Sequence, residues 1–364
     1  MNFGSKHFEL PFHVVKRSTI PVWKSMLFRA IAVIAALLLC SILAIFMIEA
    51  NPFEFIATMF DGAFGSKRRI WKFAKDASML LCIALAITPA FKMRFWNIGA
   101  EGQTLMGALA SVAVIIYLRG TGIPNALLLP LMLIASVVVG AIWGGIPAIF
   151  KAKWGTNETL FTLMMNYVAT GLVSYFLLIW TPSGSSVLGM LSEGHLPIIA
   201  HEYLLVILLV VLLTVALHIY QQYTKQGYEI SVVGESENTA RYIGIAVEKV
   251  IIRTMLISGA ICGFAGFLIV SGLDHSVTTT SVGGMGFTAI MVSWLAKFNP
   301  LIMIGTSALI TFLEQGSAQI TTNFNIDSAF PSMVVGIVLF FIIGCEFFIN
   351  YQLKSKNSEK GGNK

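Results

Sequence analysis

The segment NIGAEGQ places two amides and a carboxylate between two long apolar stretches of the chain. Asn97 and Gln103 can each donate and accept hydrogen bonds, and Glu101 can accept them or carry a proton. A charged carboxylate is costly in apolar surroundings, so we expect Glu101 to face a partner or a water-filled cavity. Gly99 and Gly102 permit close backbone approach. The segment is interpreted either as part of a transport path or as a polar turn between helices.

Three further polar side chains lie in or beside apolar runs. Asn166 sits inside TLMMNYVATG, where its amide either bonds to a neighbouring helix or contacts a substrate. Asp274 and His275 follow a long apolar run, and we expect them at the outer surface, with a proton relay as the alternative. Glu101 and Asp274 are the two candidates for an ion-coupling carboxylate.

The sequence lacks the common motifs of nucleotide-dependent and hydrolytic enzymes. No G-x-x-x-x-G-K-[ST] occurs, and GAFGSKRR at 62–69 has the wrong spacing for a phosphate loop. H-E-x-x-H and G-x-S-x-G are also absent. The four cysteines lie singly in apolar runs, as buried packing residues do. We therefore expect no catalytic residue, metal or cofactor here, and any ATP hydrolysis in a separate subunit.

The low content of charged residues indicates which kind of helix carries these polar side chains. Only 42 of the 364 residues are Asp, Glu, Lys or Arg, which is 12%, against about 25% in soluble proteins. Hydrophobic residues make up 56%. The net charge of +6 is attributed to cytoplasmic loops near anionic lipid, and no nucleic-acid partner is expected. The composition excludes a soluble protein and predicts an all-α polytopic membrane protein.

About ten apolar segments are long enough or regular enough to be membrane helices. The predicted segments are 27–48, 77–95, 103–119, 125–150, 158–180, 203–220, 250–272, 284–297, 299–315 and 331–350. An even number of spans puts both termini on one side. The positive-inside rule makes that side the cytoplasm, since most Lys and Arg residues then lie inside.

This topology divides the chain into a cytoplasmic N-terminal segment, a membrane domain and a cytoplasmic tail. The predicted ranges are 1–26, 27–350 and 351–364, with an extracellular loop at 49–76 and a cytoplasmic loop at 221–253. The extracellular loop carries five basic residues between 67 and 75, which suits an acidic partner or an interfacial helix.

An internal repeat is indicated by the order of segments in 77–180 and 250–350. Each block begins with a long apolar helix, continues through a glycine-bearing break and ends with three apolar segments. The breaks are NIGAEGQ and SVGGMG at 281–286. The predicted topology gives the two blocks opposite orientations, which is the pattern of an inverted repeat whose broken helices line a substrate path.

The loop 221–253 is the most polar stretch between spans. We expect a turn at Gly227, a short helix over Glu237–Tyr242 that starts at Ser236, and a stop at Gly244. Such a helix is either a docking surface or part of an ordinary solvated loop.

Four motifs in this loop and elsewhere resemble those of one family. GYEI at 227–230 with VGESENTARYIGI at 233–245 is similar to the loop by which permease subunits of bacterial nucleoside ABC importers meet their ATPase. NIGAEGQTLMGALA, TLMMNYVA and GFTAIMVSWLAKFNP also resemble segments of this family, in the same order. Permeases for ribose and branched-chain amino acids are related to it. The resemblance covers about 77–315.

The resemblance implies a multi-pass subunit of a bacterial plasma-membrane importer. Its partners would be ABC ATPase subunits, a second related permease or another copy of itself, and an extracytoplasmic substrate-binding lipoprotein or periplasmic protein. The coupling residues would be Gly227, Tyr228, Glu229, Gly234, Glu235, Ala240, Arg241 and Gly244. The substrate path would be lined by Asn97, Gly99, Glu101, Gly102, Gln103, Asn166, Gly283, Gly284, Gly286 and Phe287.

Other functions remain open at this point. The substrate is a nucleoside by resemblance, with a simple sugar such as ribose or galactose as the alternative. A self-contained transporter driven by protons or sodium would also fit an inverted repeat with Glu101. An intramembrane enzyme or scaffold has no supporting set of reactive residues.

Overall fold

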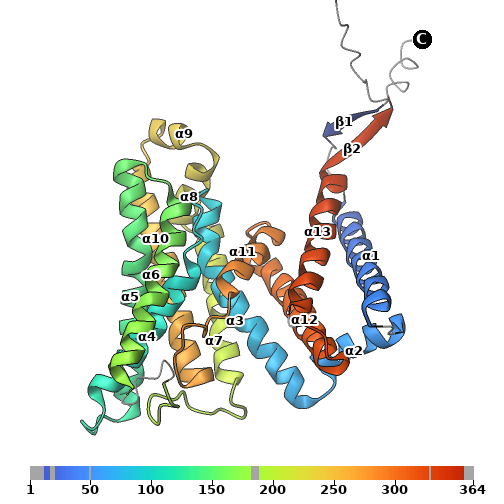
Figure 1. Cartoon of the computed structure of the whole chain (residues 1–364). Helices are drawn as coiled ribbons and strands as arrows, with labels where there is room; N and C mark the ends of the chain where they lie inside the picture. Colours follow the sequence, from blue (N-terminus) through green and yellow to red (C-terminus); the bar gives the residue numbers. More distant parts are fainter. Residues whose placement is uncertain (1–11, 17–20, 49–50, 182–187, 328, 356–364) are drawn as a thin grey trace, which may run out of the picture. The chain divides into compact units, whose positions relative to one another are not determined.

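The computed structural model describes residues 12–16, 21–48, 51–181, 188–327 and 329–355 (Figure 1). These residues form thirteen α-helices, one π-helical segment and two short strands. The helices are α1 Val22–Ile48, α2 Pro52–Phe64, α3 Lys67–Lys92, α4 Ala100–Leu118, α5 Asn125–Trp154, α6 Glu158–Trp180, α7 Leu204–Tyr223, α8 Lys225–Glu235, α9 Glu237–Tyr242, α10 Val247–Leu268, the π-helix η1 Ile269–Asp274, α11 Met285–Leu295, α12 Pro300–Phe324 and α13 Phe330–Asn350. The strands are β1 Phe12–Lys16 and β2 Tyr351–Ser355. The predicted all-α polytopic class is confirmed.

Every predicted membrane segment coincides with a helix, and eight described helical segments are long and apolar enough to cross a membrane. The exceptions are α3 and α11. Helix α11 has only 11 residues, fewer than the roughly 20 that a crossing needs. Helix α3 carries charges from Lys67 to Asp76 and again at Lys92, which shortens its apolar part.

The segment 49–76, expected as a loop, is largely helical where it is described. Helix α2 begins after Asn51, whose side-chain oxygen accepts the Phe53 N–H at 3.1 Å. Helix α3 then starts at Lys67, about ten residues before its apolar part. The charges at 67–76 excluded these residues from the predicted apolar segment, and a helix here is one of the two alternatives expected for the basic residues.

The chain divides into two compact units. Unit 1 comprises Met1–Ser66 and Phe312–Lys364, and unit 2 comprises Lys67–Thr311. In unit 1, α1 packs along α13, and Arg29 donates hydrogen bonds to Glu346 between them. Strands β1 and β2 form an antiparallel pair with Val14 opposite Leu353.

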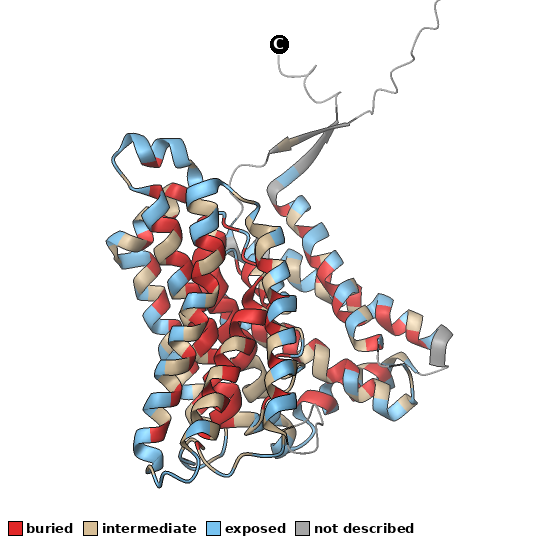
Figure 2. Ribbon diagram, turned by 60° about the vertical axis from the view of Figure 1, so that its left-hand side comes forward, coloured by how far each residue is buried: buried red, intermediate tan, exposed pale blue. Residues whose placement is uncertain are grey.

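In unit 2, helix α10 packs against α4 and α5 and most of its residues are buried. Figure 2 shows the buried residues gathered inside the helix bundle. Glycines bring these three backbones together. A Cβ added at Gly107 of α4 would lie 2.5 Å from the Gly263 Cα, and one at Gly140 of α5 would lie 2.7 Å from the same atom. Close packing of small residues is the usual way for helices to associate in membranes. The glycines therefore allow the backbones of α4, α5 and α10 to approach closely inside unit 2.

The expected order of elements appears in both blocks of the predicted repeat. Helix α3 is followed by a break at 93–99 and then α4, α5 and α6, while α10 and η1 are followed by a break at 275–284 and then α11, α12 and α13. The short segment after the second break is α11. The opposite orientation of the blocks remains a prediction.

Candidate functional site at the helix breaks and the α8–α9 segment

Two buried amides organise the first break. The Asn97 side chain donates to Gln103 Oε1 at 3.3 Å and to Ser258 Oγ at 3.2 Å. Its own oxygen accepts the Gln103 amide at 3.0 Å and the Gly99 N–H at 3.0 Å. Asn97 and Gln103 are 0% and 1% exposed. In this conformation the two amides satisfy each other and the irregular backbone, as buried polar groups must.

Asn166 of α6 fastens the same break from a second helix. Its oxygen accepts the Gly102 N–H at 2.9 Å, and its NH₂ group donates to the Ile98 carbonyl at 2.9 Å. Thr162, one turn earlier on α6, accepts the Ile98 N–H at 3.2 Å. A Cβ at Gly102 would come within 2.8 Å of the Asn166 oxygen, so glycine is required for this approach. The structure favours the helix-to-helix interpretation of Asn166.

Glu101 joins the first break to the second. Its two carboxylate oxygens accept the backbone N–H groups of Gly284 at 2.9 Å and of Gly286 at 2.8 Å. Gly283 and Gly284 have φ of 60° and 81°, the left-handed region that glycine tolerates. The first N–H groups of α11 lack intrahelical acceptors, and a carboxylate is favourable there. The expected partner of Glu101 is thus the N-terminus of α11.

The predicted path residues are therefore brought together around the start of α4, with two exceptions at the edge. Asn97, Gly99, Glu101, Gly102, Gln103, Asn166, Gly284 and Gly286 form one connected set of contacts. Phe287 is exposed on α11, and Gly283 lies in the preceding turn.

The polar segment between α7 and α10 forms the two short helices α8 and α9. Ser236 accepts the Thr239 N–H at 3.3 Å and caps α9, and Gly244 follows it at φ 85°. The predicted helix Glu237–Tyr242 is confirmed. The turn expected at Gly227 is wrong, because Thr224 caps α8 through the Gly227 N–H at 3.1 Å and makes that glycine helical.

Several of the expected coupling residues anchor this segment to the other helices of unit 2. Gly234 lies directly against the Lys92 carbonyl at the end of α3. Glu229 accepts a hydrogen bond from Arg253 of α10 at 2.9 Å. Ala240 is fully buried in an apolar cluster with Ile230 and neighbouring residues of α3, α5, α8 and α10.

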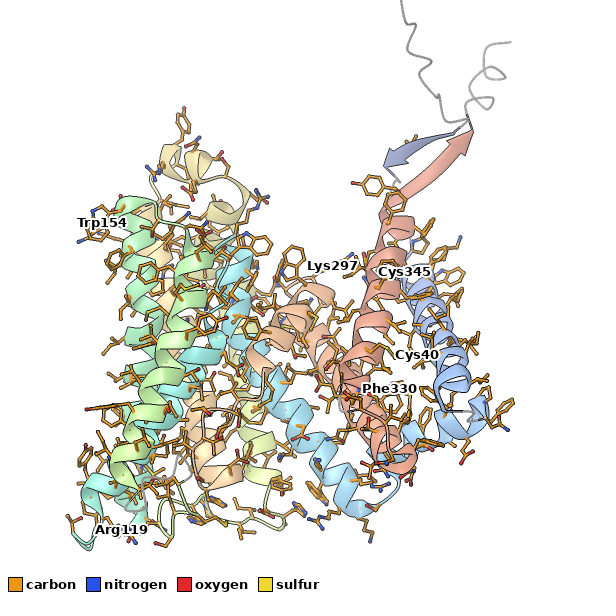
Figure 3. All side chains as sticks on the ribbon, in the orientation of Figure 1. Cys40, Arg119, Trp154, Lys297, Phe330 and Cys345 are labelled. Carbon is orange, nitrogen blue, oxygen red and sulfur yellow. The ribbon has the colours of Figure 1, made fainter. Side chains whose placement is uncertain are left out.

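The other expected coupling residues form an exposed face. Tyr228, Glu235, Arg241 and Gly244 are exposed, and the neighbouring Tyr242 is 92% exposed. Figure 1 shows α8 and α9 at one end of the helices of unit 2, and Figure 3 shows Trp154 at that end and Arg119 at the other. This exposed face, defined by these five residues, is called the α8–α9 face below.

The opposite end of unit 2 is covered by residues 188–203. His195 of this segment stacks on His275 with ring centroids 3.9 Å apart, and Leu191 N–H donates to the His275 carbonyl at 2.8 Å. Burial, with the neighbouring His195 adding to it, lowers the pKa of His275 below its usual value of 6.5. His275 is thus partly enclosed, whereas the sequence suggested a solvated residue.

Sequence reasoning missed three residues that this arrangement uses. Thr162 precedes Asn166 by four residues, so helical periodicity places both on one face. Arg253 could be recognised only as one more basic residue of a loop. Ser258 lies in an apolar helix and gives no signal of its contact with Asn97.

Comparison with known proteins identifies the family. Residues 69–343 match the family described as "Branched-chain amino acid transport system / permease component". A glucose ABC transporter permease protein of Haloferax volcanii is 29% identical, over 93% of this chain and 92% of its own length. A guanosine ABC transporter permease protein of Bacillus subtilis is 29% identical over 79% and 83%. A nucleoside ABC transporter permease protein of Lactococcus lactis is 26% identical over 93% and 95%. With its apolar helices and its family match over three quarters of the sequence, the chain is a membrane protein of the branched-chain amino acid transport system permease component family.

Proposed function

We propose that this chain is the permease subunit of a bacterial ABC importer for nucleosides. The relatives named for guanosine and for nucleosides support this substrate class. The single structural observation that carries the importer assignment is the α8–α9 face, an anchored but exposed surface suited to a motor subunit. The chain itself contains no phosphate-binding loop.

The partners are ABC ATPase subunits at the α8–α9 face, a second permease or another copy of this chain, and an extracytoplasmic substrate-binding protein. In this arrangement the chain is a multi-pass protein of the bacterial plasma membrane. Its α8–α9 face and both termini lie on the cytoplasmic side. The residues 188–203 then lie on the outer side. The basic residues of the α7–α10 region agree with this orientation.

A continuous set of contacts connects the α8–α9 face with the helix breaks. Gly234 of α8 contacts the Lys92 carbonyl, and the break at 93–99 begins at the next residue. That break leads into Glu101, which holds the start of α11. Movement of α8 by an ATPase would therefore reach both breaks, as alternating access by rocking repeats requires.

The docking assignment is tested by substitution of exposed residues on the α8–α9 face. Arg241→Ala and Glu235→Ala are expected to weaken co-purification with the ATPase subunit and substrate-stimulated ATP hydrolysis. Arg119→Ala is the matched control, because Arg119 is exposed at the opposite end of unit 2 (Figure 3). If both properties survive substitutions at Arg241, Glu235 and Tyr242, the ATPase docks elsewhere.

A simple sugar is the second candidate substrate. It is favoured by the glucose permease protein, whose similarity extends over almost the whole of both chains. Uptake of labelled guanosine in competition with unlabelled nucleosides, ribose, galactose and glucose separates the two candidates. Competition by nucleosides alone supports the proposal, and competition by sugars alone contradicts it.

A further inference from the structure

Helix α6 has one buried face and one exposed face along its whole length. The buried face is Thr162, Asn166, Ala169, Val173 and Leu177. The exposed residues, called the outer stripe of α6, are Leu160, Met164, Tyr167, Val168, Gly171, Tyr175, Leu178 and Ile179. Their spacing of three, four and seven residues puts them on one side of the helix. The buried face contacts the first helix break through Asn166. Among the described residues of unit 2, no helix covers the outer stripe.

Tyr167 occupies the middle of this stripe and is 67% exposed. It is the tenth residue of a 23-residue helix, so it lies about 14 Å from one end and about 20 Å from the other at 1.5 Å per residue. Its neighbour Asn166 bonds to Gly102 at the start of α4. Tyr167 is therefore at the depth of the helix breaks, and far from both ends where tyrosine normally anchors in a membrane interface.

The outer stripe differs in chemistry from the exposed faces of the neighbouring helices. At mid-length α5 exposes Ile134 and Val138, and α7 exposes Val211, Leu212 and Val215. These aliphatic faces suit lipid. Within the described residues the Tyr167 hydroxyl has no hydrogen-bond partner, and such a group in hydrocarbon carries a free-energy cost. The outer stripe is thus unsuited to lipid at its centre.

In the described residues the interior of unit 2 is closely packed, and the buried amides of the first break bond to each other. Its helices α4, α5 and α10 meet through glycine backbones at Gly107, Gly140 and Gly263. An open hollow of about 390 Å³ lies at the surface over the first part of α6. Leu160, Met164 and Val168 of the outer stripe line it, together with Thr156, Asn157, Phe161 and Met165. A path for solute along this face needs fewer changes in packing than one through the bundle.

We propose that the outer stripe of α6 lines the translocation path and that Tyr167 contacts the transported molecule. The phenol ring offers a flat apolar surface for a heterocyclic base, and its hydroxyl can donate or accept one hydrogen bond. Any base can stack on an aromatic ring, because every base has a flat π-face. Such stacking favours aromatic heterocycles over aliphatic solutes. This assignment rests on the proposed nucleoside function and adds to it a residue that distinguishes a nucleoside from a simple sugar.

Water access is tested by cysteine labelling of the full importer in membrane vesicles. The starting variant has alanine at the four buried cysteines, Cys40, Cys82, Cys262 and Cys345, and its guanosine uptake is measured first. In this background, Tyr167→Cys is expected to react with a charged, water-soluble methanethiosulfonate, and guanosine is expected to slow the reaction at least fivefold. The matched control, Leu212→Cys on the aliphatic face of α7, is expected to stay unlabelled. Equal resistance of both variants overturns the proposal, because the stripe is then covered by lipid or protein.

Contact with substrate is tested by transport kinetics. Tyr167→Phe is expected to raise the KM for guanosine about fivefold, and Tyr167→Leu at least twentyfold, with little change in thermal stability. Leu212→Ala is expected to leave the KM unchanged. Unchanged KM in both Tyr167 variants overturns the contact. If labelling of Tyr167→Cys is slowed by glucose or ribose but not by guanosine, the path assignment is supported while the proposed nucleoside function fails.

Discussion

One carboxylate oxygen of Glu101 accepts a hydrogen bond from the Gly286 N–H at 2.8 Å, across 185 residues of sequence. The other oxygen accepts the Gly284 N–H at 2.9 Å. Glu101 is in the first turn of α4, and both glycines are at the start of α11. The carboxylate therefore connects α4 and α11, the first helices after the two breaks. A displacement of one break would be transmitted to the other through this contact.

Removal of the Glu101 carboxylate is expected to destabilise unit 2. Glu101→Ala leaves two partly buried N–H groups without acceptors, at a cost of about 2–5 kcal/mol in the free energy of unfolding. Glu101→Gln keeps one acceptor oxygen and is expected to cost about half as much. Thermal unfolding of the purified protein measures both. Glu248→Ala is the control, since Glu248 is also in the first turn of a helix but is exposed. Equal losses of stability in Glu101→Ala and Glu248→Ala would contradict the connection of α4 to α11 through Glu101.

A methyl group at Gly102 is expected to separate α4 from α6. The new Cβ would lie 2.8 Å from the Asn166 oxygen and 2.9 Å from its Cα, so the Gly102 N–H bond must break or the helices must move. Gly102→Ala should lower stability by about 1–3 kcal/mol and reduce transport. Gly305→Ala on α12 is the control, because nothing lies within 4 Å of its new Cβ and it is outside the outer stripe of α6. A stable, active Gly102→Ala protein would show that this contact is dispensable.

Loss of the Glu229–Arg253 pair is expected to uncouple ATP hydrolysis from transport. The pair joins α8 to α10 at 2.9 Å and has little exposed surface on the Glu229 side chain. Glu229→Gln leaves the Arg253 charge without its carboxylate, so α8 should move more freely against α10. We expect the ATPase to remain bound while uptake per ATP hydrolysed falls several-fold. Lys225→Ala is the control, because Lys225 is exposed and 4.0 Å from the same carboxylate. An unchanged ratio of uptake to ATP hydrolysed in Glu229→Gln would show that the pair has no role in coupling.

The stacked histidines predict a loss of stability at mildly acidic pH. Burial and His195 lower the pKa of His275 in the folded protein below its usual 6.5, despite the opposing effect of Glu202 and Asp274. Between these two pKa values the unfolded chain binds more protons than the folded one, so stability falls as the pH drops below about 6.5. Thermal unfolding between pH 7.5 and 5.5 measures this slope. His275→Gln should flatten the slope, and His195→Gln should reduce it. A slope that is the same in all three proteins contradicts the prediction.

The sequence predicts where helices begin and end better than it predicts which residues contact one another in the folded chain. Ser236 and Gly244 delimit α9 as helix-capping chemistry requires, and Glu101 has a partner as its cost in apolar surroundings demands. The identity of that partner follows from tertiary packing and carries no local signal. The same holds for Asn166, whose amide is used for packing, whereas the less conspicuous Tyr167 beside it is exposed. Periodicity groups residues onto one face of a helix but does not say what covers that face.

We propose that this chain imports nucleosides only together with a separate ATPase. Transport in liposomes that contain this chain, its permease and ATPase partners and the substrate-binding protein, with labelled guanosine as the probe, decides whether this is so. We predict uptake that requires both ATP and the ATPase subunits and that persists when proton and sodium gradients are abolished. Accumulation of guanosine by this chain alone, driven by an ion gradient, would contradict the claim and identify a secondary transporter.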